Sequence, residues 1–122
     1  MTKFIVHAVV PTNTTRLIFD GPIIRDGGSW TLVPTRCSSV VIDHAKVLNR
    51  MDLRKNDAID VQDVVVRNSI GISLDDSFST KTWPSTGIAV NYPEDPQVLY
   101  NVTFSNNLAW THCCGFKVRQ GV

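Results

Sequence analysis

The side chains best suited to chemistry gather in one stretch near the carboxyl end, W-T-H-C-C-G-F-K, residues 110–117. This stretch places Trp110, His112, Cys113 and Cys114 within five positions. A cysteine thiolate is both a nucleophile and a metal ligand, and a nearby histidine is a base that would activate it. The first question is therefore whether residues 110–117 form a reactive site or part of a strand.

The spacing of these residues favours a strand. Neighbouring side chains on a strand point to opposite faces, so Cys113 and Cys114 of a regular strand cannot both ligate one metal ion. Structural zinc sites use spacings such as C-x2-C, and the third cysteine, Cys37, stands alone. We expect Cys113 to fill the core, His112 to be half-exposed, and no catalytic, cofactor or metal site to form.

Two other groups of residues contain side chains that could form a catalytic triad or a calcium site. Asp43 and His44 lie close to Ser38 and Ser39, but no G-x-S-x-G motif supports a hydrolase triad. Asp75 and Asp76 lack the D-x-D-x-D-G spacing of a calcium loop, so a solvated turn is expected there. The glycine-rich loops that bind nucleotide phosphates are also missing.

Residues 43–55 are the one segment in which the spacing of apolar residues also fits the 3.6-residue period of a helix. Asp43 would be the N-cap of this helix, and Lys46, Arg50 and Arg54 would form a basic stripe able to contact phosphates. Interspersed aspartates dilute the stripe, and the net charge of +1 provides no general attraction for nucleic acid. A solvated face is therefore expected, with nucleic acid as a weakly supported partner.

The elements that must position these residues are strands. Apolar residues recur at every second position in short runs separated by Gly, Pro, Asn and Asp, which is typical of half-buried strands. We expect residues 23–25 to pair with residues 30–32 across the turn at Asp26–Gly28, and a last hairpin to turn at Asn106-Asn107. The alternation slips at Asp63, which predicts a bulge or bend. No fixed repeat is apparent.

These patterns predict one domain over residues 1–122. The fold class is all-β and mainly antiparallel, a β-sandwich or partly open barrel of about eight to ten short strands with at most one short helix around residues 43–55. The composition is 43% hydrophobic and 19% charged, which indicates a globular chain. The strand order does not follow from the sequence.

The opening residues M-T-K-F-I-V-H-A-V-V are interpreted as a strand rather than as a signal peptide. His7 interrupts the apolar run, and Pro11 follows where a cleavage motif would be needed. No apolar stretch is long enough for a transmembrane helix. Three cysteines are an odd number for a disulfide scaffold. We expect reduced thiols and a location in a virion, or in the host cytoplasm during assembly.

The missing catalytic motifs favour a non-enzymatic role. The leading hypothesis is a structural or interaction subunit of a homo-oligomeric assembly, most concretely a coat, cement (decoration) or tail protein of a virus or phage particle. Its partners would be copies of itself and other particle proteins, without cofactors or membranes. The candidate interface anchors are the large aromatic residues Trp30, Trp83, Tyr92, Tyr100 and Trp110.

Two alternatives stay open. A lectin-like module would bind a glycan through Trp83, Tyr92 and Asn91, because aromatic rings beside small polar groups suit sugars. A small Cys/His enzyme would use Cys113 or Cys114 with His112.

Overall fold

The computed structural model describes residues 6–61, 63–80 and 100–118. Within these ranges all regular elements are strands, as expected, and residues 43–55, where at most one short helix was expected, contain no helix. No helix that could cross a lipid bilayer is found in this part of the chain. The strands are β1 (Ile18–Asp20), β2 (Ile23–Arg25), β3 (Val40–Asp43), β4 (Lys46–Leu48), β5 (Ile59–Val61), β6 (Val64–Arg67), β7 (Ile70–Ser73), β8 (Phe78–Thr80), β9 (Thr103–Ser105), β10 (Leu108–Thr111) and β11 (Phe116–Val118).

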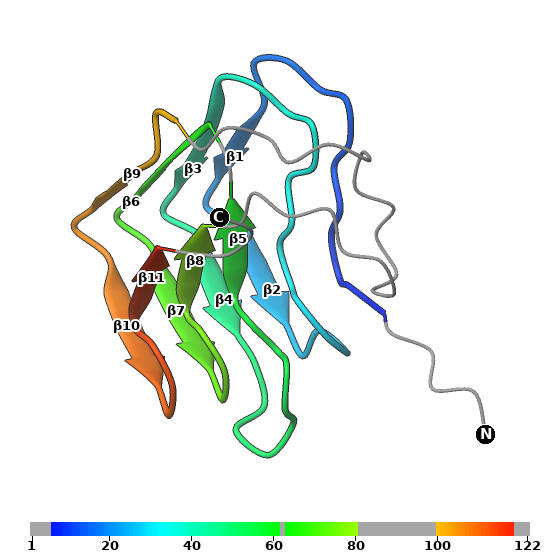
Figure 1. Ribbon diagram of the computed structural model, residues 1–122, viewed down its shortest axis with the longest axis vertical. Helices are drawn as coiled ribbons and strands as arrows, with labels where there is room; N and C mark the ends of the chain where they lie inside the picture. The colour runs from blue at the N-terminus through cyan, green and yellow to red at the C-terminus, as the bar shows by residue number, and fades with distance from the viewer. Residues whose placement is uncertain (1–5, 62, 81–99, 119–122) are drawn as a thin grey trace.

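The strands form three parallel sheets, so the prediction of a mainly antiparallel sandwich or barrel is wrong. The first sheet has the order β1-β3-β6-β9, the second β10-β7-β4-β2 and the third β11-β8-β5. The chain visits the sheets in turn and then begins the next coil, as in a parallel β-helix (Figure 1). Isolated parallel bridges from Val9 to Leu32 and from Leu32 to Ile59 extend the third sheet toward the amino end.

Both predicted hairpins are corners between sheets. Residues 23–25 do form a strand, but β2 pairs in parallel with β4 and not with residues 30–32. Asn106-Asn107 does form a turn, but β9 pairs with β6 and β10 pairs with β7. The expected bend at Asp63 is confirmed, because this residue has a positive φ of 52° and separates β5 from β6. A corner of only two residues redirects the chain into a different sheet.

A strand, a two-residue corner and a second strand recur at each passage from the first to the second sheet, which corrects the expectation that nothing repeats. Phe19, Ile42 and Val66 occupy the same register, at separations of 23 and 24 residues, and Phe104 continues the column. The first corner residue in each coil has a positive φ. These residues are Gly21, His44, Asn68 and Asn106, with φ values of 73°, 52°, 51° and 51°. Glycine and asparagine tolerate this conformation better than most residues.

The core lies inside the coil, where inward side chains of successive coils stack. Leu32, Ile59 and Phe78 follow one another up the third sheet and are fully buried. The ring of Phe116 stacks on Phe78 at 5.0 Å between centroids, and the ring of Phe104 lies within 5.8 Å of both. Full burial of such a side chain contributes about 1.5–3 kcal/mol, which applies to Leu32, Ile59 and Phe78, whereas Phe116 is 51% exposed.

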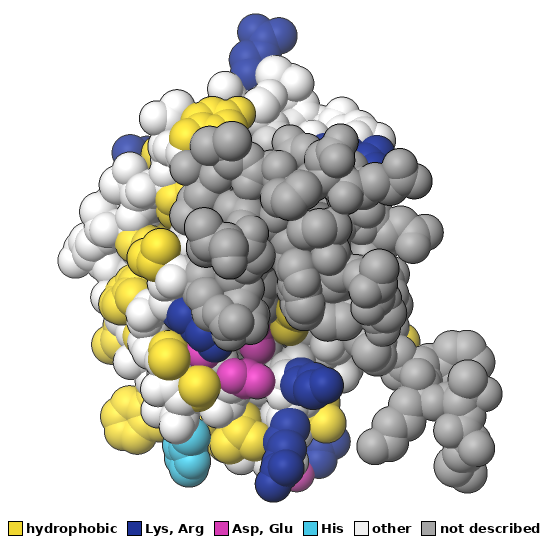
Figure 2. Space-filling view, in the orientation of Figure 1, with side chains coloured by type: hydrophobic (Ala, Val, Ile, Leu, Met, Phe, Trp, Pro, Cys, Tyr) yellow, Lys and Arg dark blue, Asp and Glu magenta, His cyan; other side chains and the backbone are white. Residues whose placement is uncertain are grey.

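The outer face of the second sheet is apolar and partly exposed. Its outward side chains form two rows across the strands: Ile23, Lys46, Ile70 and Leu108, then Arg25, Leu48, Ile72 and Trp110. Trp110 is 66% exposed, Ile23 63% and Leu108 53%. In Figure 2 hydrophobic side chains gather along the left side of the molecule, where Figure 1 places β10. We call these eight residues the apolar face.

Candidate functional site

The corners between the second and third sheets stack three chemically reactive residues. The register Ile59–Phe78–Phe116 places Asp57, Asp76 and Cys114 at the same position of successive coils. Hydrogen bonds from Ala58 N to the Asp76 carbonyl, at 2.9 Å, and from Ser77 N to the Cys114 carbonyl, at 3.0 Å, fix this stacking. Residues 57, 76 and 114 are far apart in the sequence, yet the coil brings them together.

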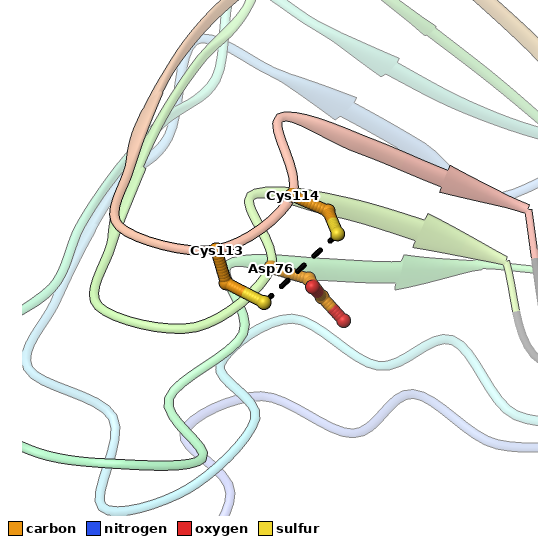
Figure 3. Close-up of side chains that lie close together, drawn as sticks. All are labelled: Asp76, Cys113 and Cys114. Carbon is orange, nitrogen blue, oxygen red and sulfur yellow. Dashed lines mark hydrogen bonds between the residues drawn. The ribbon is translucent and has the colours of Figure 1, made fainter.

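The two adjacent cysteines point their sulfur atoms toward the same place, next to Asp76 (Figure 3). Their Sγ atoms are 3.9 Å apart. The prediction that they serve opposite faces is wrong, because residues 112–115 form a bend between β10 and β11 and not a regular strand. Cys113 is exposed and Cys114 is partly buried, so the expectation that Cys113 fills the core is also wrong.

The carboxylate of Asp76 is the centre of this cluster. Asp76 is 2% exposed, although a solvated turn was expected there. Its Oδ2 accepts a 2.6 Å ion-pair hydrogen bond from Lys117 Nζ. The hydrogen bond and the negative charge of Asp76 raise the pKa of Lys117. Burial of a carboxylate is costly unless it is paired, and Lys117 provides a partner.

The same carboxylate raises the pKa of the Cys113 thiol to about 12. The largest cause is the hydrogen bond with Asp76, followed by burial of the sulfur and the hydrogen bond with Cys114. The thiol of Cys113 is therefore protonated at neutral pH. This protonation state is opposite to that of an activated cysteine nucleophile.

Two further carboxylates lie beside Asp76. One oxygen from each of Asp57, Asp75 and Asp76 lies within 4.8 Å of the others, and so do one donor atom from each of Asp76, Cys113 and Cys114. Asp57 is 3% exposed. The arrangement concentrates acidic and thiol groups at one corner, with Lys117 as a neighbouring cation.

Buried asparagines hold this corner in place. Asn56 is fully buried, and its Oδ1 accepts hydrogen bonds from Leu74 N, at 3.0 Å, and Asp75 N, at 3.2 Å. Asn49 Nδ2 in turn donates to the Asn56 carbonyl at 2.7 Å. Because these amides satisfy backbone groups that a tight corner leaves without sheet partners, they fix the loop that carries Asp75 and Asp76.

His112 does not join the thiol cluster. No hydrogen bond links its imidazole to either thiol among the described residues, and it instead lines an open pocket of about 510 Å³ with Arg54, Lys55, Leu74 and Asp75. The geometry therefore does not bring together the base and nucleophile that a Cys/His enzyme would need.

The structure separates the predicted basic stripe. Lys46 lies on β4 and points outward from the apolar face, whereas Arg50 and Arg54 lie in the loop that follows. Arg50 forms a bidentate ion pair with Asp52, with N–O distances of 2.9 and 2.6 Å. Without a helix the four-residue spacing no longer aligns the three cations in one stripe, and contact of Lys46, Arg50 or Arg54 with phosphates stays a prediction.

The interface candidates fall into three groups. Trp110 and Tyr100 are exposed, at 66% and 49%, as an interface anchor requires. Trp30 is 6% exposed, so it belongs to the interior of this chain. Trp83 and Tyr92 lie outside the described residues, as does Asn91 of the glycan hypothesis.

Asn56 and Lys117 were not singled out from the sequence, and Asp76 was expected only in a solvated turn. A signal exists in the tripeptides Asp57-Ala58-Ile59, Asp76-Ser77-Phe78 and Cys114-Gly115-Phe116. In each, a small residue separates a polar residue or thiol from a large apolar one, and the large residues occupy the same register in successive coils. Alignment of these tripeptides would have placed Asp76 beside Cys114.

Comparisons of this chain with protein-family models, with curated proteins and with solved structures found no match.

Proposed function

We propose that this protein is a non-enzymatic interaction subunit that associates with copies of itself through the apolar face. The observation that carries the proposal is the exposure of Ile23, Leu108 and Trp110 on one flat parallel sheet. Contiguous exposed apolar surface is costly in water and commonly marks an interaction site. Trp is also the residue type most often found at the energetic centre of interfaces.

The distribution of charge on the apolar face favours a second copy as the partner. Its two cations, Arg25 and Lys46, lie on β2 and β4, whereas Trp110 lies on β10 at the opposite edge of the sheet. A two-fold axis parallel to the strands, through the middle of the sheet, places Arg25 of each copy over the indole of the other. A cation over an aromatic ring is attracted by about 0.5–2 kcal/mol, and the two-fold axis provides the contact twice.

More specifically, we propose that the assembly is a virus or phage particle and that this protein is one of its components. A subunit of that kind needs a rigid scaffold and an interface more than a catalytic centre. The raised pKa of Cys113 and the separation of His112 from the thiols support a non-enzymatic role over the Cys/His alternative. The glycan alternative depends on Trp83 and Tyr92, and a glycan array tests it directly.

Light scattering during gel filtration of the purified protein at tens of micromolar tests self-association. We expect a dimer or larger oligomer, and we expect Trp110→Ala to weaken association by at least ~30-fold, as for the loss of a central anchor. Ile18→Ala is the matched control, since Ile18 is 69% exposed but lies on the first sheet. A monomeric wild-type protein, or equal effects of the two substitutions, would refute the proposal.

A further inference from the structure

The cluster of Asp76, Cys113 and Cys114 at the corner between the second and third sheets takes no part in the proposed self-association. We propose that Cys113, Cys114 and Asp76 form a binding site for one thiophilic divalent cation of the zinc class. The three donors come from two successive coils, and one donor atom from each lies within 4.8 Å of the others. Two sulfur atoms and one carboxylate oxygen form a donor set suited to zinc or cadmium and unsuited to magnesium or calcium.

The separation of the sulfur atoms fits a shared ion. In a tetrahedral site with zinc–sulfur bonds of about 2.3 Å, two thiolates lie about 3.8 Å apart. The Sγ atoms of Cys113 and Cys114 are 3.9 Å apart before any ion is bound. A disulfide would need about 2.05 Å, so the sulfurs are spaced for an ion between them rather than for a bond.

The third donor is held rigidly. Asp76 is 2% exposed, its backbone nitrogen bonds to Asp75 Oδ1 at 3.1 Å, and its carbonyl accepts from Ala58 N. Figure 3 shows its carboxylate beside both sulfur atoms. Such preorganisation lowers the entropic cost of collecting the ligands. Because Cys113 is exposed, the fourth position is open to a water molecule.

The charges of the loaded site balance. Binding releases the two thiol protons to solvent and leaves two thiolates and one carboxylate around a dication. That set carries one net negative charge, which the Lys117 ammonium neutralises from 2.6 Å on Asp76 Oδ2. Lys117 then acts as a positioning residue that orients the carboxylate, in the way that outer partners orient metal ligands.

Titration with cadmium under anaerobic, reducing conditions tests the site. We expect a thiolate-to-cadmium charge-transfer absorption that saturates at one ion per chain, and a higher Tm with zinc present. Cys113→Ser and Cys114→Ser should each lower the affinity by more than the ~10–100-fold that loss of an outer partner costs. Cys37→Ser is the matched control, because Cys37 is a buried cysteine whose Sγ contacts the carbonyls of Pro11 and Thr35.

Cadmium X-ray absorption provides a second readout that is independent of folding stability. Two sulfur scatterers and further oxygen scatterers in the first shell are expected for the wild-type protein, and one sulfur for each single cysteine variant. Absence of a saturable absorption, or its persistence in the Cys113→Ser,Cys114→Ser double variant, would overturn the proposal. Neither result depends on whether the protein forms oligomers. The metal site can therefore be refuted while self-association stands, and the reverse.

Discussion

Asp43 shows how one residue at a corner links pH to stability. It follows the inward Ile42 of β3, accepts hydrogen bonds from Asn68 Nδ2 at 2.9 Å and Arg67 Nε at 2.7 Å, and is 8% exposed. These contacts lower the pKa of Asp43 below its ordinary value of 3.8, with the Asn68 hydrogen bond as the largest cause. A carboxyl with a lowered pKa binds its proton less tightly in the folded than in the unfolded state. It therefore stabilises the fold above about pH 4 and loses this effect as the pH falls further.

We predict that Asp43→Asn makes stability less sensitive to acid. The difference in unfolding free energy between about pH 6 and pH 3, measured by urea denaturation, should be smaller in the variant than in the wild-type protein. Asn68→Gly should act in the same direction, because it removes the main donor while glycine still accepts the positive φ of 51°. An equal pH dependence in all three proteins would contradict the assignment.

Single residues also explain why the repeat was missed in the sequence. The equivalent corner positions carry Gly21, His44, Asn68 and Asn106, three different residue types that share only a positive φ. Asn106 Nδ2 donates to Asn68 Oδ1 at 2.8 Å, which stacks one corner on the next. The backbone conformation recurs, whereas the side-chain identity does not.

The second sheet depends on an unusually small residue at one inward position. Gly71 lies beneath the ring of Phe78, and a Cβ atom placed on it would be 3.2 Å from two ring carbons and 3.3 Å from Ser77 Cβ. The ring is fully buried between neighbouring coils and stacks on Phe116. Gly71 thus provides the space that lets the aromatic stack form.

We predict that Gly71→Val destabilises the protein by about 1–3 kcal/mol, the usual cost of overfilling a packed core. The higher strand propensity of valine contributes at most about 1 kcal/mol in the other direction, so the clash dominates. Urea denaturation measures the change, and Ile70→Val on the outer face of the same strand is the control, with an expected loss below about 1.5 kcal/mol. A Gly71→Val variant with wild-type stability would contradict this prediction, because it would show that the residues around Phe78 move to accommodate the larger side chain.

At this scale the sequence predicted the strands but not their partners. Alternation correctly indicated β-structure at residues 23–25, 70–73 and 103–105, because side chains alternate in every strand. Alternation is the same for parallel and antiparallel pairing, so a two-residue corner resembled a hairpin turn. The antiparallel pairing that was expected excludes the Cys113–Asp76 site, since the site needs the parallel register between coils.

For the whole molecule, the proposed self-association depends on the cations and the aromatic surface of the apolar face. If Arg25 packs over the partner's indole, as proposed, Arg25→Glu should weaken association by about 5- to 30-fold through loss of the cation–ring attraction. Arg36→Glu is the matched control, because Arg36 is exposed but lies outside the apolar face. Sedimentation velocity of both variants checks this, and a weaker oligomer in the control alone would place the interface elsewhere.

The spacing between strands differs among the three edges of the coil. The connection from the first to the second sheet always has two residues, whereas β5 and β6 are separated by two residues and β8 and β9 by twenty-two. The connection from the first to the second sheet is constant in length, while the connection before the first sheet differs in length from one coil to the next. New peptide segments could therefore be grafted between β8 and β9 without disturbing the winding, so the scaffold can gain new recognition loops while its interior stays the same.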